Sequence, residues 1–187
     1  MLRRDSFSIP AFELKRQGRK MREKLTKSDV KKIQEEIEHR KLVERKELIE
    51  AVKEARAHGD LSENFEYHAA KKEKNRNESR IRYLEKMLKT AIIVEDQSKE
   101  DEVGLNNTVE LYCEDDAEIE TYRLVTSVRG SSLKGLISIE SPVGKAILGK
   151  REGERVYVKV SESAGYYVVI KRIIKTQDES EDKIRSY

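Results

Sequence analysis

The sequence predicts an α+β protein, in which an N-terminal antiparallel helical hairpin precedes a small antiparallel sheet with one short helix. Residues 26–58 and 70–88 carry apolar side chains at helical spacing, with no proline or glycine. Beyond residue 90 the chain changes to short runs rich in Val, Ile and Tyr between Gly, Asn, Asp and Ser, a pattern typical of strands joined by turns. A composition of 40% charged and 36% hydrophobic residues suits solvated helices beside one modest core.

The first helix is expected over residues 26–58. Thr26 and Asp29 have the spacing of a capping box, and Leu25 and Val30 flank them as a hydrophobic staple. The apolar positions that follow are Ile33, Ile37, Leu48, Val52 and Ala55. About thirty helical residues would form a rod roughly 45 Å long, at 1.5 Å per residue.

The second helix is expected to return along the first. Its inward stripe consists of Ala70, Lys74, Asn77, Ile81, Leu84 and Leu88. If the turn centres near Leu61, the numbers of antiparallel partners sum to about 121, so that Ile33 meets Leu88. Because each stripe is too narrow to stabilise a helix alone, the two stripes are expected to bury each other.

The strand-like part of the chain contains several candidate strands. They are Ala91–Val94, Thr108–Cys113, Glu118–Val125, Leu136–Ile139, Arg155–Val160 and Tyr166–Ile174. Ser141 and Pro142 open the short helix as its N-cap and first residue. Val143–Leu148 is the body of this helix, and Gly149 is expected to end it.

Residues 1–24 form a basic N-terminal extension. One interpretation is an arm that attracts nucleic acid. The favoured one is that translation begins at Met21, because Gly18, Arg19 and Lys20 can be encoded by purine-rich codons that resemble a ribosome-binding site. The other expected regions are a coiled-coil domain over 25–98 with its tip at 58–66, a sheet domain over 99–176, and a polar, frayed tail over 177–187.

The composition also excludes several classes. Cys113 is the single cysteine, so neither an intramolecular disulfide nor a cysteine-rich metal site can form. No run of about 18 or more apolar residues is present, so no membrane partner is expected, and the expected setting is a reducing cytoplasm. No glycine-rich phosphate loop, nucleophile elbow or suitably spaced Cys/His pair occurs, so a free-standing enzyme is not indicated.

The predicted turn between the helices contains two carboxylates, Asp60 and Glu63. The spacing of Asp60 and Glu63 favours a capping box at the start of the second helix. The functional interpretation is that they project as hard oxygen ligands for Mg²⁺. Two carboxylates cannot enclose Mg²⁺ alone, so the protein alone needs no cofactor and a partner would have to complete the site.

Two further sets of side chains lie near this turn. Lys72, Arg76 and Arg80 are four residues apart and, with Arg56, could guide an RNA backbone, although a charge run is usually a solvated face. His58 and His68 flank the turn and could bind zinc with Asp60, but capping or aromatic roles explain them better.

Two long stretches of the chain resemble the bacterial Gre transcript-cleavage factors, most closely their GreA type. The stretches are Ala55–Asn64 with Glu66–Lys71, and Ser141–Lys150. The resemblance covers residues from about 21 to 175, and residues 1–20 have no counterpart in it. Two departures are Phe65, where a small residue is usual, and Glu154, where Asp is usual.

The resemblance implies a coiled coil followed by an FKBP-like domain, in a monomer that assists RNA polymerase rather than acting as an independent enzyme. The C-terminal domain would dock at the rim of the polymerase secondary channel, and the coiled coil would reach the active centre. Asp60 and Glu63 would there help hold Mg²⁺ while the polymerase cleaves backtracked RNA near its 3′ end. Gly59, Leu61, Ser62 and Asn64 would shape the tip, and Arg56, Lys72 and Arg76, with Arg80, would guide the RNA.

Two alternatives are left by the sequence. A Gre-like channel inhibitor would use the same architecture to block catalysis, but such homologues carry a more heavily acidic tip. The other is a structural coiled-coil adaptor, in which Asp60 and Glu63 only cap a helix.

Overall fold

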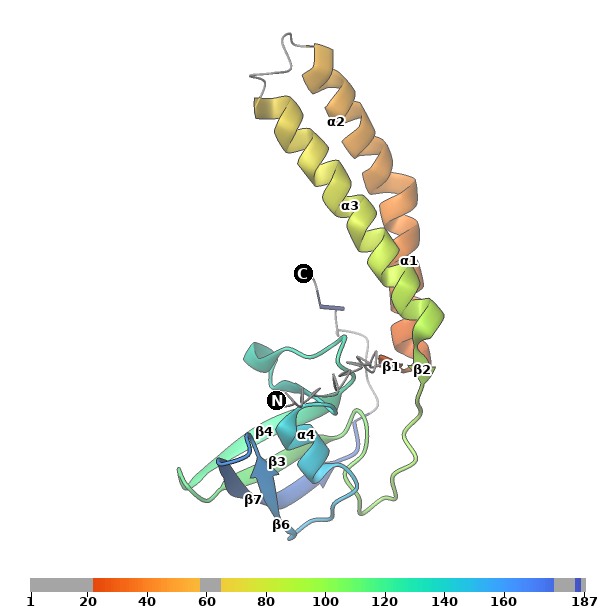
Figure 1. Cartoon of the computed structure of the whole chain (residues 1–187). Helices are drawn as coiled ribbons and strands as arrows, with labels where there is room; N and C mark the ends of the chain where they lie inside the picture. The colour runs from red at the N-terminus through yellow and green to blue at the C-terminus, as the bar shows by residue number, and fades with distance from the viewer. Residues whose placement is uncertain (1–21, 58–64, 177–183, 186–187) are drawn as a thin grey trace, which may run out of the picture.

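The structure is a computed structural model that describes residues 22–57, 65–176 and 184–185. A long helical hairpin stands on a small sheet domain, and the free end of the hairpin points away from the sheet (Figure 1). Its first arm comprises α1 (Lys27–His39), a π-helical segment η1 (Arg40–Glu44) and α2 (Arg45–Ala57). Its second arm is α3 (Phe65–Thr90). The expected fold class is therefore confirmed.

The π-helical segment departs from the prediction of one uninterrupted α-helix. In η1 the Arg45 amide donates to the carbonyl oxygen of Arg40, five residues earlier. The side chain of Asn77 on the opposite arm donates to the same oxygen at 3.3 Å. π turns are rare and occur mostly as single-turn bulges within α-helices, and here a side chain of the opposite arm adds a hydrogen bond to the turn. Because that partner lies on the other arm, the sequence of the first arm alone gave no signal for it.

The two arms pair in the expected antiparallel register. Arg40 contacts Asn77, Arg45 forms two hydrogen bonds with Glu78, and Lys41 contacts Glu85. At the base of the hairpin, the buried apolar residues are Leu25, Ile33, Ile37, Ile81, Leu84, Met87 and Val128. Of the predicted stripe, Asn77, Ile81 and Leu84 are buried, whereas Ala70, Lys74 and Leu88 are only partly buried. Met87, which was not in the predicted stripe, is buried beside Leu88.

The start of the hairpin has the predicted capping box, and a short strand that was not predicted lies just before it. Asp29 N donates to Thr26 Oγ1 at 3.0 Å and Thr26 N donates to Asp29 Oδ2 at 2.8 Å, which confirms the capping box. The predicted strand at Ala91–Val94 is a short β2 (Ile92–Ile93). It pairs in parallel with β1 (Lys24–Leu25), a strand that the sequence did not indicate. This pairing ties together the two chain ends of the hairpin.

The second domain is a five-stranded sheet in the order β5-β4-β3-β7-β6. Its strands are β3 (Thr108–Cys113), β4 (Glu118–Val125), β5 (Leu136–Ser138), β6 (Arg155–Lys159) and β7 (Gly165–Ile174). The strands pair antiparallel as expected, except that β4 and β5 are parallel, so the sheet is mixed at this edge. Residues 126–135, which include the 3₁₀ turn η2 (Ser132–Lys134), bring the chain back so that β5 runs in the same direction as β4.

One short α-helix, α4 (Pro142–Ile147), packs on this sheet. Ser141 Oγ accepts the Gly144 amide at 3.0 Å, and Gly149 follows the helix with a positive φ of 76°, so both predicted signals are confirmed. A Cβ atom on Gly144 would lie 2.1 Å from the carbonyl oxygen of Ser138. Only glycine therefore allows α4 to approach the chain after β5 this closely.

The described part of the C-terminal tail is packed rather than frayed. Ile184 is half-buried against the apolar cluster at the base of the hairpin, and the Arg185 amide donates to Val128 O at 2.7 Å. The prediction of a frayed tail was thus wrong for these two residues. Among the helices that the structure describes, none is long and apolar enough to cross a membrane.

Candidate functional site

The free end of the hairpin lies between Ala57, the last residue of α2, and Phe65, the first of α3 (Figure 1). The residues that the sequence singled out for the tip fall between these two positions. They are His58, Gly59, Asp60, Leu61, Ser62, Glu63 and Asn64, and they lie outside the described residues, as does the extension before Met21. What the structure provides is the support for this segment, a pair of antiparallel helix ends far from the sheet domain.

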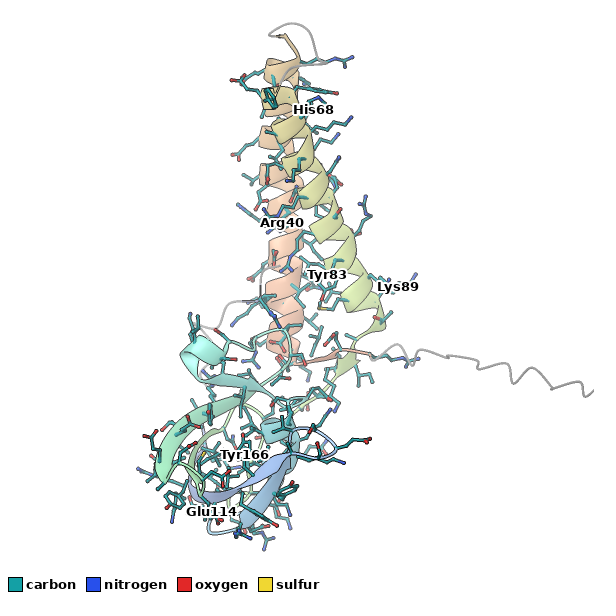
Figure 2. All side chains as sticks on the ribbon, turned by 60° about the vertical axis from the view of Figure 1, so that its left-hand side comes forward. Arg40, His68, Tyr83, Lys89, Glu114 and Tyr166 are labelled. Carbon is teal, nitrogen blue, oxygen red and sulfur yellow. The ribbon has the colours of Figure 1, made fainter. Side chains whose placement is uncertain are left out.

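The described side chains beside the tip are aromatic and basic. Phe65 is 88% exposed. The rings of Tyr67 and His68 meet edge to face with their centroids 5.6 Å apart, and Lys71 Nζ lies 5.7 Å from the centroid of the Tyr67 ring. Figure 2 shows His68 near the free end of the rod. Within the described ranges no group of three or more His, Cys, Asp or Glu side chains could hold a metal ion.

Three of the four predicted RNA-guiding residues are on the surface. Arg56, Lys72 and Arg76 are exposed, and they lie on the two arms behind the tip. Arg76 forms a loose ion pair with Glu73, at 4.0 Å between two exposed side chains. Such a pair contributes little to stability, so its charge can serve another contact.

Arg80, the fourth predicted residue, does not belong to this surface. Its side chain is 9% exposed, and its guanidinium donates to both carboxylate oxygens of Glu36, at 2.9 and 3.1 Å. Arg80 therefore joins the two arms of the hairpin through Glu36, instead of lying on the surface where it was predicted to guide RNA. Each step of four residues advances a helical stripe by about 40°, so the position eight residues beyond Lys72 has turned toward the opposite arm.

A polar network crosses the hairpin between Arg80 and η1. Glu36 accepts from Arg80 and from Arg40 Nε, the latter at 2.8 Å, and Arg40 also donates to Asn77 Oδ1 at 3.1 Å. Burial would raise the pKa of Glu36, but the hydrogen bonds and charges of Arg80 and Arg40 outweigh it and hold this pKa below its usual value. These hydrogen bonds hold the two arms together in the middle of the hairpin, where few apolar residues are buried.

A second buried polar cluster joins the hairpin to the sheet domain. Arg129 Nε lies 2.8 Å from Asp29 Oδ1, with both side chains fully buried. Thr126 Oγ1 donates to Asp29 Oδ2 at 2.8 Å, and Arg129 also donates to Asn106 Oδ1 at 2.7 Å. Sequence reasoning assigned Asp29 only to the capping box and missed Arg129, since no local pattern marks a pairing between distant segments.

Comparisons with known proteins agree with this architecture. Residues 23–93 match the family described as "Transcription elongation factor, N-terminal", and residues 97–175 match "Transcription elongation factor, GreA/GreB, C-term". Transcription elongation factor GreA of Geobacillus kaustophilus is 44% identical over 136 residues, covering 72% of this chain and 86% of that protein. GreA of Chloroherpeton thalassium is 42% identical over 152 residues, covering 81% of this chain and 96% of that protein.

A solved structure is also similar in sequence. It is GreA factor homolog 1 (Gfh1) of Thermus thermophilus, which is 29% identical, with a TM-score of 0.37 over 81% of this chain and 98% of that one. The sequence matches define a transcription elongation factor. The chain belongs to the GreA/GreB family of these factors, and the relatives described above carry the name GreA.

Proposed function

We propose that this elongation factor enters the secondary channel of bacterial RNA polymerase and stimulates the enzyme's own cleavage of backtracked nascent RNA, which rescues arrested complexes. The observation that carries the proposal is the position of Asp60 and Glu63 in the chain between the free ends of α2 and α3. The 26 residues of α3 correspond to roughly 39 Å of helix, so a rod of this length can reach a buried centre while the sheet domain stays outside.

The chemistry of the two carboxylates fits a shared Mg²⁺ site. Asp60 and Glu63 offer hard oxygen donors, whereas Mg²⁺ requires six ligands in near-ideal octahedral geometry. The polymerase would supply the remaining protein ligands, so the factor would hold no ion stably alone. When bound, the ion would activate water and stabilise charge on the phosphate. In our proposal this chain adds the carboxylates and orients them; it is not an enzyme by itself.

The other parts of the molecule have supporting roles in the proposal. The sheet domain would dock at the rim of the channel, in the cytoplasm where the polymerase works, and one monomer would suffice. Arg56, Lys72 and Arg76 would attract the RNA 3′ end toward the tip, because exposed cations along a groove steer a phosphate backbone. Arg80 has no part in this, since Glu36 already neutralises it in the hairpin.

The proposal is tested by adding the protein to a stalled, backtracked elongation complex with Mg²⁺. Release of short 3′ RNA fragments at a rate above that of the polymerase alone would support it. Slowed synthesis without cleavage would instead identify a channel inhibitor. Absence of any effect, with binding verified, would identify a structural adaptor.

A further inference from the structure

The junction between the hairpin and the sheet domain is narrow. Within the described parts of the chain, no helix of the hairpin packs extensively on a strand of the five-stranded sheet. Among the described residues, the direct connections include the Asp29–Arg129 cluster and the contact of Val128 with the apolar base of the hairpin. An ion pair at 2.7 Å between Lys24 Nζ, in β1, and Glu140 Oε1 is a further one. A rod attached through so small an area has limited resistance to bending, because few contacts would be lost on reorientation.

Two residues of the C-terminal tail lie across this junction. The Arg185 amide donates to Val128 O at 2.7 Å, which attaches the tail to the sheet domain. The carbonyl oxygen of Arg185 accepts from Arg80 Nη2 at 3.0 Å, which attaches it to α3. Ile184 adds its side chain to the apolar cluster that holds Met87 and Val128. The same short segment therefore contacts both domains.

The polar contacts of this segment use the backbone. The side chain of Arg185 is exposed, whereas its amide and carbonyl make the two bridging bonds. The contact with Arg80 also links the segment to the Glu36 network of the hairpin. The family match ends at residue 175, so these contacts lie outside the region that the chain shares with that family description.

We propose that Ile184 and Arg185 form a strap that holds the hairpin at a fixed angle to the sheet domain. With the strap in place, α3 and residues 127–129 are joined through one segment. Without it, the Asp29–Arg129 cluster, the small apolar contact and the Lys24–Glu140 ion pair are the connections among the described residues that remain to resist rotation of the rod. Any consequence for the reach of the tip into a polymerase rests on the proposed function, but the strap itself is a property of the isolated protein.

The test measures the distance between the two domains in the full chain. Nitroxide labels are placed at Lys46→Cys on α2 and Lys159→Cys on β6, both exposed positions, with Cys113→Ala to remove the native thiol. Pulsed electron paramagnetic resonance then gives the distribution of the distance between the labels. Arg185→Pro removes the amide hydrogen that Val128 accepts, and Ile184→Asp places a charge in the apolar contact. Arg185→Ala is the matched control, because it keeps both backbone bonds.

The strap predicts one narrow distribution for the parent and for Arg185→Ala, and a broadened or shifted one for Arg185→Pro and Ile184→Asp. Circular dichroism should show unchanged helix and strand content in all four proteins. Identical distributions in all four would overturn the proposal, and so would equal broadening by Arg185→Ala and Arg185→Pro. Since no polymerase is present, the outcome is independent of whether the protein stimulates transcript cleavage.

Discussion

Asp29 and Arg129 form a fully buried ion pair that connects the first turn of α1 to the loop after β4, with Arg129 Nε 2.8 Å from Asp29 Oδ1. The same carboxylate caps α1 through Thr26 and accepts from Thr126. A residue that starts the hairpin thus also attaches it to the sheet domain. Because the pair is buried, each charge depends on the other for compensation.

Breaking this pair from either side should strongly destabilise the protein. Asp29→Asn or Arg129→Met alone should lower the free energy of unfolding by about 3–5 kcal/mol, since each leaves one buried charge uncompensated. The double variant should recover a substantial part of that loss, because neither charge remains. Urea denaturation of the four proteins provides the double-mutant cycle. Strictly additive losses would show that the two charges do not depend on each other.

Substitutions of Arg76 and Arg80 should have different effects, because Arg76 is predicted to face RNA and Arg80 holds the hairpin together. Arg80→Ala should lower the free energy of unfolding by about 2 kcal/mol, because Glu36 loses a charged partner inside the hairpin. Arg76→Ala should change it by less than about 0.5 kcal/mol, since Arg76 is exposed. Under the proposed function, Arg76→Ala should slow transcript cleavage about fivefold, the equivalent of about 1 kcal/mol. An Arg76 variant that cleaves at the parent rate would remove this residue from the RNA-guiding surface.

Acidification should weaken the hairpin through Glu36. The pKa of Glu36 is depressed in the folded protein, so the unfolded chain binds a proton at higher pH than the folded one. The stabilisation that the Glu36 carboxylate gives the folded protein is therefore fully present above pH 4.5, its ordinary pKa. It is lost as the pH falls through the lower pKa of the folded protein. Glu36→Gln should lower the free energy of unfolding by about 1–3 kcal/mol at neutral pH. This difference from the parent protein should shrink as the pH falls below about 4.5 and the Glu36 carboxylate of the parent becomes protonated.

Glu35 is the matched control for that experiment. It neighbours Glu36 in sequence, but its side chain is 63% exposed and lies 4.0 Å from Lys31. Glu35→Gln should therefore give nearly the parent stability at every pH. If both variants show the same pH dependence, the network around Glu36 does not contribute the expected stability.

The sequence predicted those features that depend on local pattern. The capping box at Thr26, the antiparallel register of the hairpin and the Ser141 cap all follow from spacing and local hydrogen bonding, and the structure has each of them. The features it missed depend on partners that are distant in sequence. Arg129 is paired with a residue of α1, and the π turn at Arg40 is satisfied from α3.

Arg80 and the tail illustrate the same limit. Spacing by four placed Arg80 on a surface stripe, but its guanidinium instead donates to the Glu36 carboxylate on the other arm and is largely buried. Ile184 lies in a polar segment that was expected to be frayed, yet its side chain packs against an apolar cluster formed by both domains. For the candidate site, Arg56, Lys72 and Arg76 are exposed, as an RNA-guiding surface requires, and their role stays a prediction. Asp60 and Glu63 remain a prediction from motif and resemblance.

The most direct test of the central claim is the rate of RNA cleavage in a backtracked elongation complex with Mg²⁺, compared between the parent protein and Asp60→Asn or Glu63→Gln. Each substitution removes one negative charge while keeping the size of the side chain, so binding to the polymerase should be nearly intact. We predict that both variants lose most of the stimulated cleavage, because the shared metal site then lacks a carboxylate. Cleavage by both variants at the rate of the parent protein would contradict the account.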